Sequence, residues 1–366
     1  MRLKADWAGV CKMDVAQNRN RAALVGISLI ILTAAAWAGL LRMGWNWPPL
    51  QPTLPINHGA LMAAGFFGAL ISLERAVAMG KAWAYGAPLT NGIGGLLIVF
   101  GIPGISGPLL ITIGSIWLVA IFIVVLRQHL TDYTAVMAIG AVALLIGNLL
   151  WMFGWPVYRV VMWWSGFLVL TIVGERLELG RMMRPSQFAK TAFWIATGIY
   201  ILGLIAIIAD YNLGMRITGI GTIALGLWLL AFDIARRTVR MDGLTRYIAV
   251  CLLSGYVWLL VGGGLAVIYG GVPAGPIYDA ILHSVFLGFV FAMIFGHAPI
   301  IFPAVLGVKI PYRNNFYAPL ILLHASLILR ILGDLVGAAP ARQWGGLINE
   351  IAVLLYFLMI IWNRRK

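Results

Sequence analysis

The chain has 366 residues, of which 62% are hydrophobic and 10% charged, and its mean hydropathy is +0.95. Because a soluble domain carries about a quarter of its residues as charged side chains, this composition excludes an ordinary soluble protein and predicts a polytopic membrane protein. The net charge of +14 could indicate a nucleic-acid partner, but it is divided among short connections between apolar runs, so we expect no nucleic acid.

Apolar runs of about 20 residues, each long enough to cross a bilayer as a helix, follow one another along the chain. A basic arm over residues 1–21 precedes them and a basic tail over 363–366 follows, which leaves a single transmembrane domain over 22–362. The sequence therefore predicts an all-α fold with about twelve transmembrane helices. The expected spans are 22–43, 58–79, 84–102, 105–126, 133–154, 156–174, 190–209, 213–232, 246–270, 277–297, 316–337 and 343–362.

Basic residues alternate in density from one connection to the next. Most of the 26 Lys and Arg residues lie in the arm, in the tail and in every second connection, such as 176–190 and 236–246. Because loops rich in Lys and Arg stay in the cytoplasm, we expect both termini to be cytoplasmic. The sequence thus predicts a multi-pass protein of a bacterial cytoplasmic (inner) membrane, with the lipid bilayer as its surroundings.

One short pattern recurs in three of the expected spans. The second span contains "GFFGALISLER" (65–75), the sixth contains "GFLVLTIVGER" (166–176), and the tenth contains "GFVFAMIFGHA" (288–298). Each has Gly-Phe followed by seven residues, and then Glu in the first two and His in the third. Because the three matches fall four spans apart, they indicate three four-helix repeats in series.

Four of the five histidines fall in or at the ends of expected spans: His58, His283, His297 and His324. His129 lies in a connection and is expected to be solvated. An ionisable side chain within a membrane span is a functional candidate by default, although any single one could be a core imidazole bonded to a carbonyl. His283 and His297 are fourteen positions apart, which places them within about 40° of one helix face and about 21 Å apart.

The direction of each span pairs these histidines by depth. His58 and His283 share the outer leaflet, and His297 and His324 share the inner one. Imidazole pairs on facing helices can ligate haem iron axially or contribute to a copper site. Two filled axial positions favour electron transfer, whereas an open one allows a diatomic gas to bind.

Other ionisable residues support these pairs. Arg330 reaches towards the outer leaflet, where it could hold haem propionates or pair with Asp334 four residues on. Glu74 and Glu175 end their spans on the inner side. Interfacial anchoring and ion pairing are one interpretation of these glutamates, and metal ligation or proton transfer beside His297 is the other.

The chain resembles two related groups of membrane proteins. Twelve spans with outer histidines on spans 2 and 10 are similar to the catalytic subunit of haem–copper oxidases. The stretches "HSVFLGFVFAMIFGHAPIIFPAVLG" (283–307), "LLHASLILRILGDL" (322–335) and "HGALMAAGFFGAL" (58–70) resemble the NnrS family, membrane proteins with haem and copper that are linked to nitric oxide metabolism. Spans 6 and 7 contain no histidine, so the resemblance does not extend to a three-histidine copper centre of the oxidase type.

We therefore expect an integral membrane b-type haem protein, NnrS-like, with one or two haems b and copper as a further option. It would transfer electrons from a redox partner or handle nitric oxide; as an enzyme it would be an oxidoreductase acting on nitric oxide or a related small molecule. One alternative is a cofactor-free transporter, with helices broken around Gly92–Gly95 and Gly262–Gly264. The other is a structural subunit of a respiratory complex.

Overall fold

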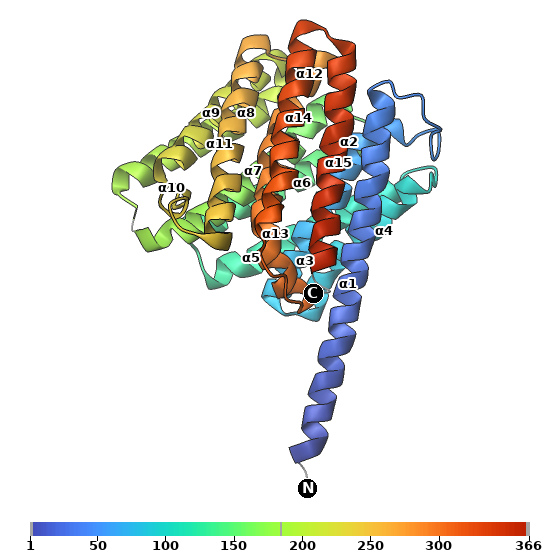
Figure 1. The fold of residues 1–366 in the computed structure, drawn as a ribbon, viewed down its shortest axis with the longest axis vertical. Coiled ribbons are helices and arrows are strands. Elements are labelled where there is room, and N and C mark those ends of the chain that lie inside the picture. The colour runs from blue at the N-terminus through green and yellow to red at the C-terminus, as the bar shows by residue number, and fades with distance from the viewer. Residues whose placement is uncertain (1–2, 184, 364–366) are drawn as a thin grey trace.

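The computed structural model describes residues 3–183 and 185–363, and their regular elements are all helices (Figure 1). Two π-helical segments, Leu61–Phe67 and Ser284–Phe291, continue the helices that carry His58 and His283. The α-helices are α1 Leu3–Arg42, α2 His58–Ala60, α3 Gly68–Met79, α4 Gly86–Val99, α5 Ser106–Gln128, α6 Asp132–Met152, α7 Val157–Gly180, α8 Gln187–Ala209, α9 Tyr211–Phe232, α10 Ala235–Thr238, α11 Gly243–Tyr269, α12 Pro276–His283, α13 Ala292–Leu306, α14 Tyr317–Val336 and α15 Ala339–Asn363.

Eleven helical stretches among the described residues are long and apolar enough to cross a membrane. The all-α class is confirmed, and the multi-pass character follows from these eleven. The expected span over 84–102 is the exception, because α4 has 14 residues and reaches about 21 Å, short of a hydrocarbon core of about 30 Å. The described residues therefore have eleven such helices against the twelve expected, but α4 still connects the two sides of the bundle. Arg21 near the start of the first span donates to Tyr85 directly before α4, and Gln51 in the loop after α1 donates to the carbonyl oxygen of Ile98 near its end.

Two glycine-rich stretches expected to break helices, Gly92–Gly95 and Gly262–Gly264, lie inside the continuous helices α4 and α11. A Cβ at Gly95 would meet Ile31 Cδ1 of α1 at 2.5 Å, and one at Gly263 would meet a carbonyl oxygen of α9 at 2.8 Å. Small residues let membrane helices approach closely. The glycines therefore serve helix packing at these positions, and the expected breaks do not occur.

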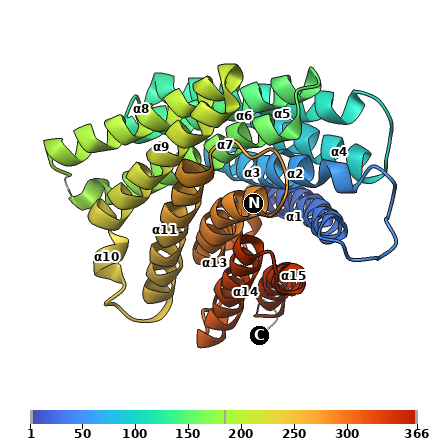
Figure 2. The ribbon, with the colours of Figure 1, turned by 90° about the horizontal axis from the view of Figure 1, so that it is seen from above.

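Three helical stretches occupy the centre of the bundle. In their most apolar windows, 67% of Pro55–Met79, 83% of Val157–Gly180 and 72% of Pro276–Leu306 is buried, against 39–56% for the other eight. Viewed from above, α3, α7 and α13 lie between a row containing α8, α6 and α5 and a row containing α11, α14 and α15 (Figure 2). These central helices carry the recurring Gly-Phe pattern, whereas the threefold repeat itself stays a prediction.

The helix α1 begins and α15 ends on the same side of the bundle (Figure 1). We call this the termini side, and the other the opposite side. From Leu3 on, the helix α1 continues without interruption through the rest of the expected arm and into the first expected span, ending at Arg42. The assignment of the termini side to the cytoplasm remains a prediction from charge.

Candidate functional site

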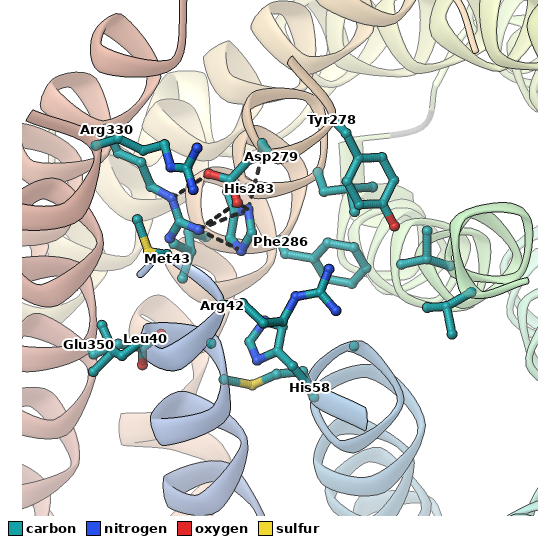
Figure 3. Close-up of a pocket in the computed structure, with 18 of the residues that line it drawn as sticks. Leu40, Arg42, Met43, His58, Tyr278, Asp279, His283, Phe286, Arg330 and Glu350 are labelled. Carbon is teal, nitrogen blue, oxygen red and sulfur yellow. Dashed lines mark hydrogen bonds and ion pairs between the residues drawn. The ribbon is translucent and has the colours of Figure 1, made fainter. Parts of the chain in front are cut away.

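A cavity of about 240 Å³ opens at the opposite side of the bundle, among α1, α2, α7, α12, α14 and α15 (Figure 3). Its apolar wall includes Leu40, Met62, Phe67, Val161, Leu282, Phe286, Leu287 and Phe291. Its charged residues are Arg42, Asp279, Arg330, Arg342 and Glu350. A mostly apolar wall with a few charged groups is typical of a site for an amphipathic ligand.

Two of the predicted histidines face this cavity from different helices. The ring centroids of His58 and His283 lie 6.4 Å apart, and the ring planes differ by 23°. The Nδ1 atom of His58 lies 2.7 Å from the carbonyl oxygen of Ala35, and Nδ1 of His283 lies 2.9 Å from that of Asp279. Because a carbonyl oxygen can only accept, each Nδ1 donates, and each Nε2 keeps a lone pair. This is how metal-ligating histidines are oriented in proteins.

The local sequence explains why the His58 ring lies where it does. A short 3₁₀ turn, Pro55–Asn57, ends directly before His58 and leads the chain into the helix. On the facing helix, a Cβ at Gly39 would meet Cε1 of His58 at 2.7 Å. The imidazole therefore packs directly on the backbone of α1, and only glycine leaves it that space.

Arg330 forms a two-pronged ion pair with Asp279 in the same cavity. Its Nε lies 2.7 Å from Oδ2 and its Nη2 lies 2.8 Å from Oδ1 of Asp279. The sequence indicated Asp334 as a possible partner of Arg330. In the structure Oδ1 of Asp334 lies 3.7 Å from Nε of Arg342 instead. Arg330 Nη2 also lies 3.2 Å from Nε2 of His283, so a ligand bound at that nitrogen would replace the contact.

Arg42 lies at the rim of the cavity, where its guanidinium forms one long hydrogen bond. Its Nη1 has a hydrogen bond of 3.5 Å to the carbonyl oxygen of Pro55. Figure 3 shows its guanidinium extending into the space below the Phe286 ring. A cation so placed can bind a carboxylate or phosphate that enters the cavity.

A second cavity, of about 80 Å³, lies towards the termini side and is lined by Glu74, Glu175 and His297. The structure thus brings together the three residues that the sequence grouped there. Arg75 pairs with both carboxylates, at 3.1 Å from Glu74 and in close contact with Glu175. One guanidinium between two carboxylates on different helices holds α3 to α7, so the glutamates form internal ion pairs.

His297 lies beside a second buried ion pair. Arg176 contacts Asp233 through Nε at 2.9 Å and Nη2 at 3.2 Å, and the two side chains are 3% and 0% exposed. Nη1 of Arg176 lies 3.4 Å from Nε2 of His297, whose Nδ1 lies 2.7 Å from the carbonyl oxygen of Met293. Both nitrogens of His297 are therefore engaged by protein atoms.

The structure does not bring His297 and His324 together. Trp258 donates to Nδ1 of His324 over 2.9 Å, and Ser254 lies 2.9 Å from Nε2. Both partners belong to α11, and His324 lines neither of the two cavities. His324 therefore links α14 to α11, and the expected inner pair is not formed.

The two cavities lie one above the other on the same central helices. Phe67 lines both of them, and the Phe291 ring lies 5.3 Å from it in an edge-to-face contact. One aromatic layer thus separates the two sites. Across the described ranges 3–183 and 185–363, no group of three or more His, Cys, Asp or Glu side chains is placed to hold a metal ion.

Three functional candidates were missed by the sequence interpretation: Arg42, Asp233 and Asp279. Asp279 precedes His283 by four residues and so lies on the same helix face, a signal that could have found it. Arg42 and Asp233 end their helices, and at such positions an ionisable residue is expected to face water. No pattern in the sequence distinguishes them from loop residues.

The fold and the cavities define a class: an all-helical protein with many membrane-crossing helices and an amphipathic cavity between its central helices. Residues 21–365 match the family described as "Domain of unknown function (DUF8744)". The chain belongs to this family. No curated protein matches the chain.

Proposed function

We propose that this chain is an integral membrane protein that binds one haem b between His58 and His283. The observation that carries the proposal is the pair of imidazoles 6.4 Å apart and nearly parallel, on helices distant in the sequence. Two imidazoles on opposite faces of one metal ion, each with a bond of about 2.0 Å, have ring centroids about 6 Å apart. The spacing in the cavity agrees with that value.

The surrounding residues also suit this cofactor. The Phe67, Phe286 and Phe291 rings provide apolar surface, which suits a flat macrocycle and keeps water away from it. Arg42 at the rim, and Arg342, which lines the cavity and has a 3.7 Å contact with Asp334, would hold the two carboxylates, since a guanidinium binds a carboxylate through two parallel hydrogen bonds. Bound there, haem would supply one-electron redox chemistry.

The residues of the chain would set how that chemistry is used. Because Nδ1 of His58 and of His283 donates to backbone, each Nε2 can act as a ligand. At His283 the ligand would replace the 3.2 Å contact with Arg330 Nη2. If both histidines held the haem, electron transfer would be the favoured activity. We extend the proposal to an NnrS-like role in a bacterial inner membrane with a redox partner, on the sequence resemblance alone. Nitric oxide handling would instead suit a haem that one of these two histidines holds alone.

The proposal leaves out a second haem and copper. The geometry supports neither, because His324 is bonded to α11 and His297 is the one histidine among the residues that line the termini-side cavity. Glu74 and Glu175 are held by Arg75. The termini-side cavity is therefore an ion-pair cluster.

The test is the absorption spectrum and haem content of the protein purified from cells supplied with haem precursor. We expect one haem per chain, a Soret band, and loss of both in His58→Ala and in His283→Ala. The matched control is His129→Ala, which removes an exposed imidazole from the loop after α5. A colourless protein, or a Soret band that persists in both cavity variants, would refute the proposal.

A further inference from the structure

A third cavity, of about 470 Å³, opens on the termini side between the ends of α7 and α9 and the start of α8. It shares no lining residue with the cavity of the proposed haem site. Arg236, Arg237 and Arg240 line it, and all three are exposed. Three guanidinium groups around one hollow give it a strongly positive potential.

The carboxylate nearest to these arginines is already engaged. Asp233 lines the cavity, but its two oxygens accept from Arg176, and Oδ1 also accepts from the backbone N–H of Ala235. In the part of the chain that the structure describes, no carboxylate forms an ion pair with Arg236, Arg237 or Arg240. The cavity thus has an excess of positive charge that an anion would neutralise.

The other lining residues suit a phosphate ester that has an apolar part. The Ser186 oxygen accepts from the backbone N–H of Ala189, so its hydroxyl proton remains free to be donated. Trp228 and Phe232 form apolar wall. The Phe188 ring is 73% exposed beside the cavity and lies 6.3 Å from the Phe232 ring, which continues this apolar surface outward.

We propose that this cavity binds a phosphate group through Arg236, Arg237 and Arg240. Guanidinium groups bind phosphate through paired hydrogen bonds and keep their charge at every physiological pH. The phosphate can come from an anionic phospholipid headgroup or from a free phosphate. Topology alone would account for basic residues in this connection, but it does not require them to surround a hollow.

The experiment compares three proteins in nanodiscs of neutral phosphatidylcholine. These are the unmodified chain, Arg237→Gln/Arg240→Gln, and the control Lys309→Gln/Arg313→Gln, which removes the same charge from an exposed connection outside the cavity. One arm adds phosphatidylglycerol and counts bound lipids by native mass spectrometry. The other adds inorganic phosphate, with chloride at equal ionic strength, and measures the thermal unfolding midpoint. Size-exclusion profiles verify that each variant is folded.

We expect saturable binding in at least one arm, weakened about tenfold or more by the cavity substitutions and unchanged in the control. Saturation by phosphatidylglycerol alone identifies a lipid headgroup as the source, and saturation by inorganic phosphate identifies a free phosphate. Arg237→Lys/Arg240→Lys, which keeps the charge without the planar fork, should bind with intermediate strength. The proposal is overturned if neither arm saturates, or if the control loses as much binding as the cavity variant.

Discussion

The opposite-side cavity and the termini-side cluster use the same central helices, and both combine histidine, arginine and carboxylate. In the cluster around His297, every ionisable group has an internal partner, and the remaining space is about 80 Å³. In the cavity of His58 and His283, two imidazoles face about 240 Å³ of space with Nδ1 fixed by backbone. Ionisable residues within a membrane protein therefore have two distinct uses, and open space beside an oriented side chain distinguishes them.

The largest expected effect comes from breaking the buried ion pair between Arg176 and Asp233 beside His297. In Arg176→Met the carboxylate of Asp233 stays buried without its partner, which costs about 3–5 kcal/mol of folding free energy. The measurement is the free energy of unfolding in detergent. Arg176→Met/Asp233→Leu removes both charges and should recover most of the loss. The exposed control Arg181→Met should change the free energy of unfolding by less than about 1 kcal/mol. If Arg176→Met lost no more than this control, the ion pair of Arg176 with Asp233 would not stabilise the fold.

The next effect concerns the packing of the His58 ring against Gly39 of α1. The methyl group of Gly39→Ala would meet Cε1 of His58 at 2.7 Å, so the imidazole must leave its position. Forced packing of this kind costs about 1–3 kcal/mol, which corresponds to about tenfold weaker haem binding per 1.4 kcal/mol. Haem titration of the apoprotein measures the haem affinity of this variant.

The control for this substitution lies on the same helix. A Cβ at Gly26 meets nothing within 4 Å, so Gly26→Ala should leave haem affinity unchanged. Equal affinities in the two variants would mean that the His58 ring does not need its place against α1.

A smaller effect tests the charge beside His283. Asp279→Asn removes a carboxylate whose Oδ1 lies 3.1 Å from Nδ1 of His283. The backbone carbonyl of residue 279, which accepts from the same Nδ1, stays in place. Oxidised haem carries one more positive charge than reduced haem, so a nearby carboxylate stabilises the oxidised form more. Without that carboxylate the oxidised form is less stabilised, and the reduction potential of the haem rises. We expect about 1–2 kcal/mol at an effective dielectric constant near 20, or about 40–90 mV for one electron. Potentiometric titration measures the reduction potential, and Asp210→Asn, which removes an exposed carboxylate, is the control. A lowered potential in Asp279→Asn would contradict the position of Asp279 beside the haem.

The sequence predicted those features that depend on position along the helix axis. Apolar runs fix where helices cross, and alternating crossings place His58 and His283 at the same depth. This is why their proximity could be expected without a structure. The short length of α4 could not be expected, because hydropathy reads 84–102 as one apolar run, whereas the helix ends at Val99.

Features that depend on rotation about the helix axis could not be predicted. Arg330 was assigned Asp334 on its own helix, but it turns towards Asp279 on α12. His297 and His324 were expected in the same leaflet, but they face different neighbours: Arg176 contacts His297, whereas Ser254 and Trp258 contact His324. In a chain that is hydrophobic on every face, the sequence contains little information about which face turns inward.

The smallest expected effect concerns His324. The amide of His324→Gln can accept from Trp258 and bond to Ser254, as the imidazole does, so unfolding should change by about 1 kcal/mol or less. The haem spectrum should stay the same, because His324 lies outside the cavity of His58 and His283. A glutamine amide is a poor iron ligand, so an axial role for His324 would appear as lost absorbance at nearly unchanged stability. Absorbance and unfolding measured on the same sample therefore separate a link between α14 and α11 from a second ligand pair.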